Sequence, residues 1–263
     1  MNYSFNNSCP VTKEVYHSDI ISPMDDIDIK KYPWFSPTYV LHAHADIVRL
    51  FGQRIVDTKT DFQRVGEMRK SAIMALALHK RTGMHLLMQA SRETFPDVLT
   101  LELIESLDKP VHGNYHTVEI VDFGKNGEQD IAQFLLDIKL KNKKKAYDED
   151  TIILCYINKP FSATFDEIYK KLKREVFKPK IVYILGRRKD NGEYLLTQIF
   201  PEVAHITLDA LAQSKIYPPP LHSTFTLSSK KKIEFVKNKG VARPTGFEVF
   251  GLNEAELRKK FNK

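Results

Sequence analysis

The segment from Gly66 to Lys80 constrains the fold more than any other part of the sequence. It is rich in strong helix formers, and its apolar residues are spread nearly all round the expected helix. Gly83 then supplies a typical helix end. A helix of this kind must be covered on most of its surface, so the sequence predicts that this segment is deeply buried against other elements.

The sequence changes to strand-forming segments after this helix. Three β-rich segments separated by turn-forming residues predict an antiparallel meander over residues 84–89, 98–104 and 117–123. An amphipathic helix is predicted next, and its apolar face is formed by Ile131, Phe134, Leu135 and Ile138. The apolar run 152–157 then predicts a buried strand.

The alternation of helix and strand continues toward the C-terminus. A helix from Phe165, a strand over 180–185 that pairs in parallel with 152–157, and a hairpin return over 193–200 are expected. Together these segments predict an α/β fold, bordering on α+β, with a central mixed sheet flanked by helices. We expect an N-terminal arm and helix over 1–60, an α/β core over 61–200, and a basic C-terminal extension packed on the core over 201–263.

Composition restricts the classes of function. The 263 residues carry a formal net charge of +7, which favours a polyanionic partner. No apolar run approaches the roughly 18 residues of a membrane span, and the N-terminus lacks the pattern of a secretory signal. Only two cysteines are present, far apart, so no disulfide framework or zinc site is indicated. A cytoplasmic protein without a membrane partner is therefore expected.

Two acidic residues occupy neighbouring predicted strands. Asp97 follows Pro96 at the start of the second strand, and Glu119 lies within the third. Side chains of adjacent strands converge on one face of a sheet, so the two carboxylates can share a site. Two other interpretations remain open: Asp97 is a turn residue, or Glu119 is a solvent-facing residue of an edge strand.

The order of helix, three strands, helix and strand, with these two acidic residues, resembles the core of the PD-(D/E)xK nuclease superfamily over residues 66–158. This restriction-endonuclease-like resemblance implies that Asp97 and Glu119 bind Mg²⁺, or Mn²⁺ in its place, for phosphodiester hydrolysis. It implies a nucleic acid substrate, more often DNA, and allows a homodimer because two strands must be cut. Glu67 matches an additional acidic residue that some members use.

The superfamily carries a lysine two residues after the second acidic residue, and this chain carries Val121 there. Lys125, Lys139 and Lys141 are the candidates for a lysine that has migrated. We favour Lys141, because it shares a helix face with Gln133 and Asp137 away from the apolar stripe. The expected catalytic set is then Asp97, Glu119, Lys141 and Glu67. Two alternatives remain: the metal works without this lysine, or the chain is a catalytically inactive member that binds nucleic acid or a protein partner.

Basic residues suggest where a nucleic acid would bind. Five lysines stand within seven residues, and two arginines follow the strand over 180–185. Such residues can line a groove for phosphates, although a solvated helix end that complements the helix dipole gives the same pattern. The nucleic-acid-binding residues predicted in this way are Lys139, Lys143, Lys144, Lys145, Arg187 and Arg188.

Overall fold

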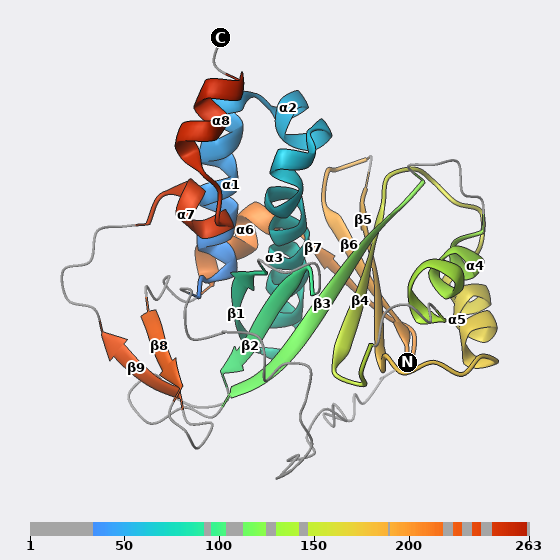
Figure 1. The fold of residues 1–263 in the computed structure, drawn as a ribbon. Coiled ribbons are helices and arrows are strands. Elements are labelled where there is room, and N and C mark those ends of the chain that lie inside the picture. The colour runs from blue at the N-terminus through green and yellow to red at the C-terminus, as the bar shows by residue number, and fades with distance from the viewer. Residues whose placement is uncertain are drawn as a thin grey trace.

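The computed structural model describes residues 34–91, 96–103, 113–124, 130–141, 147–188, 190–217, 223–227, 233–237 and 244–261. Seven strands form one sheet in which the spatial order is the order of the chain, β1 to β7. Helices cover both faces of this sheet (Figure 1). The fold is therefore mixed α/β, as the sequence predicts.

The pairing of the strands confirms two predictions. The antiparallel pairs β1–β2 and β2–β3 form the expected meander, and β4 pairs in parallel with both β3 and β5. The last two pairs, β5–β6 and β6–β7, are antiparallel. The strands of the sheet are β1 (His85–Ala90), β2 (Val98–Leu103), β3 (Gly113–Phe123), β4 (Thr151–Ile157), β5 (Ile181–Arg187), β6 (Tyr194–Phe200) and β7 (Ala204–Leu208).

The helices divide between the two faces of the sheet (Figure 1). The larger core cluster lies on one face, and its helices are α1 (Pro37–Phe51), α2 (Gln53–Thr58), α3 (Gln63–Thr82), α6 (Ala210–Ile216), α7 (Gly246–Phe250) and α8 (Glu254–Phe261). The smaller cluster lies on the other face, with α4 (Ile131–Leu135), the π-helical turn η3 (Leu136–Leu140) and α5 (Phe165–Lys173). A short 3₁₀ turn, η2 (Thr60–Phe62), precedes α3, and β8 (Ser223–Leu227) pairs with β9 (Ile233–Lys237) as a separate hairpin.

Helix α3 is the buried helix that the sequence predicts. The six consecutive residues from Ala72 to Ala77 are at most 1% exposed, so the helix is covered on all sides in this stretch. Helix α1 and strand β1 both contact it. The helix ends at Gly83, whose φ of 74° places it in the left-handed region that glycine adopts without strain. Among the described residues, no helix is long and apolar enough to cross a membrane.

The buried face of the next helical segment differs from the prediction. Ile138, expected on the apolar stripe, is 46% exposed. The backbone N–H of Lys141 bonds to the carbonyl of Leu136, five residues back, because the helix widens into a π turn. The wider turn rotates Ile138 outward, and the buried residues are Ile131, Ala132, Leu135, Leu136, Lys139 and Leu140.

A core substitution tests this arrangement. Leu154 lies on the central strand β4 and is fully buried. We expect Leu154→Ala to lower the free energy of unfolding by about 2–5 kcal/mol, because it leaves a cavity between the sheet and the α3 layer. Urea denaturation measures the effect. The matched control Leu211→Ala removes the same atoms from a side chain that is 66% exposed, and a change of less than about 0.5 kcal/mol is expected. Equal losses in the two variants would contradict the assigned core.

Candidate functional site

Glu119 lies in the interior of the sheet, on the face covered by α4 and η3. Its strand, β3, is paired with β2 on one side and β4 on the other. The residue is 0% exposed. The interpretation of Glu119 as a solvent-facing residue of an edge strand is therefore wrong, since the carboxylate is fully enclosed.

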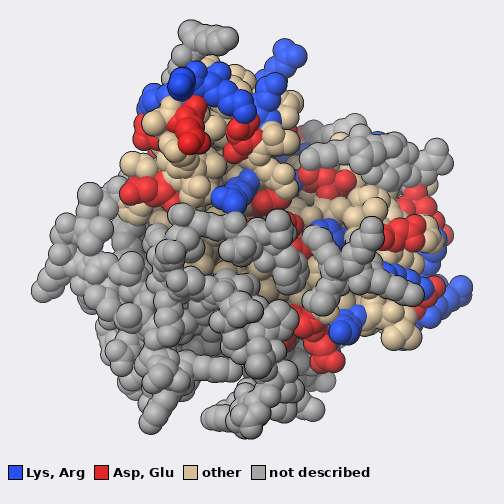
Figure 2. Space-filling model, viewed as in Figure 1, with Lys and Arg blue, Asp and Glu red and all other residues tan. Residues whose placement is uncertain are grey.

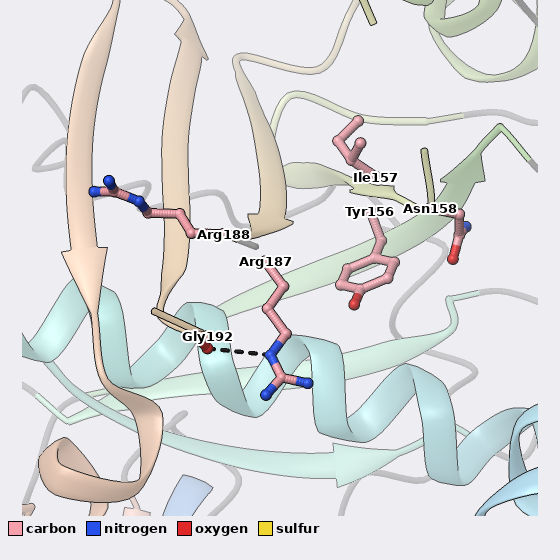
Figure 3. A pocket seen from close by; sticks show the side chains of 6 residues that line it. All are labelled: Tyr156, Ile157, Asn158, Arg187, Arg188 and Gly192. Carbon is pink, nitrogen blue, oxygen red and sulfur yellow. Dashed lines mark hydrogen bonds between the residues drawn. The ribbon is translucent and has the colours of Figure 1, made fainter. Parts of the chain in front are cut away.

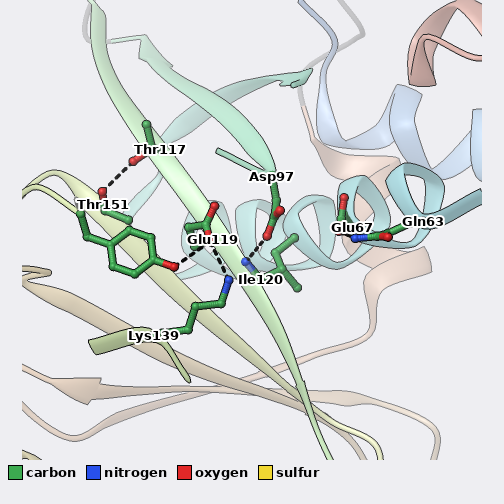
Figure 4. A network of polar contacts seen from close by, with 9 residues as sticks. Gln63, Glu67, Asp97, Thr117, Glu119, Ile120, Lys139 and Thr151 are labelled. Atoms are coloured by element: carbon green, nitrogen blue, oxygen red, sulfur yellow. Dashed lines mark hydrogen bonds and ion pairs between the residues drawn. The ribbon is translucent and has the colours of Figure 1, made fainter. Parts of the chain in front are cut away.

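Two side chains contact one oxygen, Oε2, of the buried Glu119 carboxylate (Figure 4). Lys139 Nζ from η3 lies 2.6 Å from Glu119 Oε2, and the Lys139 side chain is only 9% exposed. The hydroxyl of Tyr147 donates to the same oxygen at 3.0 Å. A buried charge is tolerated when it is paired and hydrogen-bonded in this way. We call these three residues the Glu119 triad.

Asp97 lies next to this triad, as the sequence predicts. Its Oδ2 accepts a hydrogen bond of 2.7 Å from the backbone N–H of Ile120, the residue after Glu119. Asp97 occupies the bend before β2 and is half-buried, so its carboxylate meets β3 without forming part of the strand ladder. The two acidic residues that carry the family resemblance are thus brought together in the structure.

Glu67 belongs to the same electrostatic environment. It lies on α3, where Gln63 Nε2 donates to its Oε1 at 2.7 Å. Burial raises the pKa of Glu67, and the negative charges of Asp97 and then Glu119 raise it further. In Figure 4, Asp97 lies between Glu119 and Glu67, consistent with the order of these effects. Three carboxylates therefore influence one another across β3, β2 and α3.

Lys141 does not reach the carboxylates. Its Nζ pairs instead with Glu175, and both side chains are well exposed. The predicted neighbours of Lys141 do lie together, since Gln133 Nε2 donates to Asp137 Oδ1 at 2.8 Å, but they form an outer face of the helix. The lysine that contacts Glu119 is Lys139, which was one of the sequence candidates but was not the favoured one.

The predicted nucleic-acid-binding residues that the structure describes lie in different environments. Lys139 is buried against Glu119 and does not lie on the surface. Lys143, Lys144, Lys145 and the third lysine candidate, Lys125, lie outside the described residues. Arg187 and Arg188 are exposed where β5 ends. On the face shown in Figure 2, the described basic side chains are interspersed with acidic ones and do not form one continuous basic surface.

Tyr147 is a member of the triad that sequence reasoning missed. It precedes β4, in a segment held by Thr151, whose hydroxyl donates to Asp148 at 2.6 Å and accepts a bond of 2.9 Å from Thr117 on β3. Burial and the charge of Glu119 both raise the pKa of the Tyr147 hydroxyl, so it remains a donor at all physiological pH values. No spacing in the sequence connects Tyr147 to Glu119, and only the folded sheet does so.

The donor set permits a limited role for a metal. Among the residues that the structure describes, no group of three or more histidine, cysteine, aspartate or glutamate side chains could hold a metal ion. Asp97 and Glu119 nevertheless offer two hard oxygen donors at one place. Mg²⁺ is commonly held by one or two carboxylates together with substrate phosphates and water. In the described structure the Glu119 carboxylate is enclosed and paired with Lys139, so these residues do not form a metal cage from protein alone.

Comparisons with models of protein families, with curated proteins and with solved structures find no match for this chain. The side chains around Glu119 come from a strand, a bend, a π turn and a loop that are distant in the sequence. The fold brings these charged and polar side chains together in a buried position.

Breaking the Lys139–Glu119 pair is expected to destabilise the protein strongly. Lys139→Met leaves the Glu119 carboxylate buried without its cation, and a loss of about 3–5 kcal/mol in the free energy of unfolding follows. Lys141→Met is the matched control, since its exposed pair with Glu175 contributes less than about 1 kcal/mol. Chemical denaturation of both variants measures the difference, and similar small losses would show that the pair is not buried as described.

Replacing Glu67 is expected to stabilise the protein, whereas replacing Lys139 is expected to destabilise it. The raised pKa of Glu67 means that the folded protein holds the Glu67 proton more tightly than the unfolded chain, so stability falls as pH rises through the folded pKa. Glu67→Gln removes this loss while keeping an acceptor for Gln63. We expect the variant to be more stable than the wild type at neutral pH and equally stable below about pH 4.

Urea midpoints measured from about pH 4 to about pH 8 test the Glu67 prediction. Glu202→Gln, at an exposed position, is the control for replacing a glutamate in general. A Glu67→Gln variant that is less stable than the wild type at neutral pH would contradict the assigned environment.

Proposed function

We propose that this protein is a Mg²⁺-dependent nuclease with a restriction-endonuclease-like core, in which Lys139 takes the place of the lysine missing at position 121. The observation that carries the proposal is the contact of 2.6 Å between Lys139 Nζ and Glu119 Oε2, beside Asp97. The order α3, β1, β2, β3, α4 and β4 is the order of helix, three strands, helix and strand in that superfamily. The proposed substrate is DNA, and a homodimer would present two sites for cutting both strands.

Lys139 reaches the face of β3 from which a strand lysine would project. Residues two apart on a strand share a face, so Val121 points to the same side as Glu119 and packs against the smaller core cluster. The π turn directs Lys139 to this side from the covering helix. Lys139 therefore contacts the Glu119 carboxylate from the helical layer, and position 121 on the strand carries an apolar valine.

In the proposed chemistry, Asp97 and Glu119 would hold the metal ion, and because Glu119 is 0% exposed and paired with Lys139, η3 would have to move away from the sheet for a substrate phosphate to reach the carboxylate. Mg²⁺, or Mn²⁺, supplies charge neutralisation at the scissile phosphate and a more acidic bound water when it is present. Lys139 places a positive charge where negative charge develops on the phosphate. Tyr147 fixes the orientation of the Glu119 carboxylate. Glu67, with its raised pKa, suits a group that takes up a proton closer to neutral pH.

A second candidate is a catalytically inactive protein of the same fold that binds nucleic acid or a protein partner. The specific observation in its favour is that each acidic residue already has a structural role. Glu119 Oε2 accepts from both Lys139 and Tyr147, and Asp97 Oδ2 accepts from the backbone of β3. In this case the triad anchors η3 to the sheet and has no chemical task.

Titration of Mg²⁺ and Mn²⁺ with supercoiled plasmid and with single-stranded DNA distinguishes the two candidates. We expect metal-dependent cleavage by the wild type and a loss of about 100-fold or more in Asp97→Asn, because one charged contact to the reacting centre is removed. Lys139→Arg keeps the buried charge but changes its geometry, so it is expected to lose cleavage while remaining folded by circular dichroism.

Lys141→Met is the control for this experiment and is expected to cleave as the wild type does, since Lys141 pairs with Glu175 away from the carboxylates. DNA binding without cleavage in the wild type would select the inactive candidate. Cleavage that survives in both Asp97→Asn and Lys139→Arg would place the chemistry elsewhere in the molecule.

A further inference from the structure

A cavity of about 420 Å³ lies where the parallel strands β4 and β5 end. Its lining residues are Tyr156, Ile157, Asn158, Arg187, Arg188 and Gly192 (Figure 3). Loops held by a rigid scaffold often carry binding residues, and this cavity lies where two buried strands pass into loops.

The cavity is separate from the Glu119 triad. Strand register pairs Glu119 with Ile153 and Asp122 with Tyr156, so the cavity begins three residues further along the sheet, roughly 10 Å away. An odd number of residues also reverses the face of a strand. Tyr156 packs against the cluster around α3, whereas the triad faces α4 and η3.

The cations around the cavity differ in their partners. Arg188 is bound to Asp190 through two hydrogen bonds, and Lys70 lies 2.5 Å from Asp122. Arg187 has a different contact, because its Nε donates at 3.1 Å to the carbonyl of Gly192. In Figure 3 the Arg187 guanidinium extends toward α3, on the same side as Tyr156, and Arg188 points the other way.

Arg69 on α3 adds a second cation near the Tyr156 side of the cavity. It donates to the hydroxyl of Tyr194 at 2.5 Å and to the hydroxyl of Tyr156. Within the described parts of the chain, no carboxylate forms an ion pair with Arg187 or Arg69. The local excess of positive charge and of N–H donors is the environment that an anion requires.

We propose that this cavity binds the phosphate group of a nucleotide, either free or within a nucleic acid strand. Arg187 is the principal contact, since the planar guanidinium fork matches phosphate oxygens and one edge is already oriented by Gly192. The cavity is larger than a phosphate group needs, so the remainder accommodates the sugar or base beside the Tyr156 ring and the Asn158 amide. The proposal does not depend on cleavage at Glu119.

Isothermal titration at low ionic strength tests the proposal with four probes: inorganic phosphate, adenosine monophosphate, and a short oligonucleotide with and without a 5′-phosphate. We expect binding of phosphate-bearing probes and an affinity about tenfold weaker in Arg187→Gln. Arg188→Gln is the matched control. It removes the same charge at the next residue, where the side chain already pairs with Asp190. Both substitutions are at exposed positions, and unchanged thermal unfolding confirms that the variants are folded.

The probes identify the source of the phosphate. Binding of adenosine monophosphate assigns a free nucleotide or strand end, and binding of the oligonucleotides alone assigns a backbone phosphate. Either result supports the site if Arg187→Gln weakens it and Arg188→Gln does not. No binding of any probe, or an equal loss in the two variants, overturns the proposal. The titrations are run without Mg²⁺ or Mn²⁺, so that cleavage at the Glu119 triad does not enter the result.

Discussion

The buried ion pair between Lys139 and Glu119 determines how one covering layer is attached to the sheet. Taking two charges out of water costs several kcal/mol for each ion, and the 2.6 Å contact recovers this only because Tyr147 supplies a further hydrogen bond to the same carboxylate oxygen. An apolar pair of similar volume would fill the space without that cost. Stability alone therefore does not account for the two charges.

The π turn places Lys139 where its side chain can contact Glu119. In a regular α-helix, Ile138 would lie about 60° from Leu135 and remain on the buried stripe. The wider turn carries it into solvent while Lys139 remains under the helix. The apolar residue Ile138 is thus exposed and the charged residue Lys139 is buried, which is the reverse of what their hydrophobicity predicts. Irregular turns of this kind occur often at functional sites, where local regularity is given up for the position of one side chain.

The sequence predicted those parts of the molecule that local pattern controls. Helix α3, the meander and the parallel pair β4–β5 each contain a continuous apolar run or strong propensity, and all three are confirmed. Strand β7 was missed because it is short and only partly buried at the edge of the sheet. Asp97 and Glu119 could be recognised from their places on strands. The choice of Lys139 over Lys141, and the participation of Tyr147, depended on tertiary contacts across 20 and 28 residues that no period in the sequence encodes.

Strand β3 carries Glu119 and, three residues further on, Asp122, which lies beside the cavity that β4 and β5 form. Glu119 faces η3, whereas Asp122 faces α3, where it holds Lys70 beside the ring of Tyr156. Between these two residues the strand is paired with β4, and this pairing fixes their register. The two side chains point to opposite faces of the sheet, so a ligand that contacts both sites would have to pass around the end of the sheet.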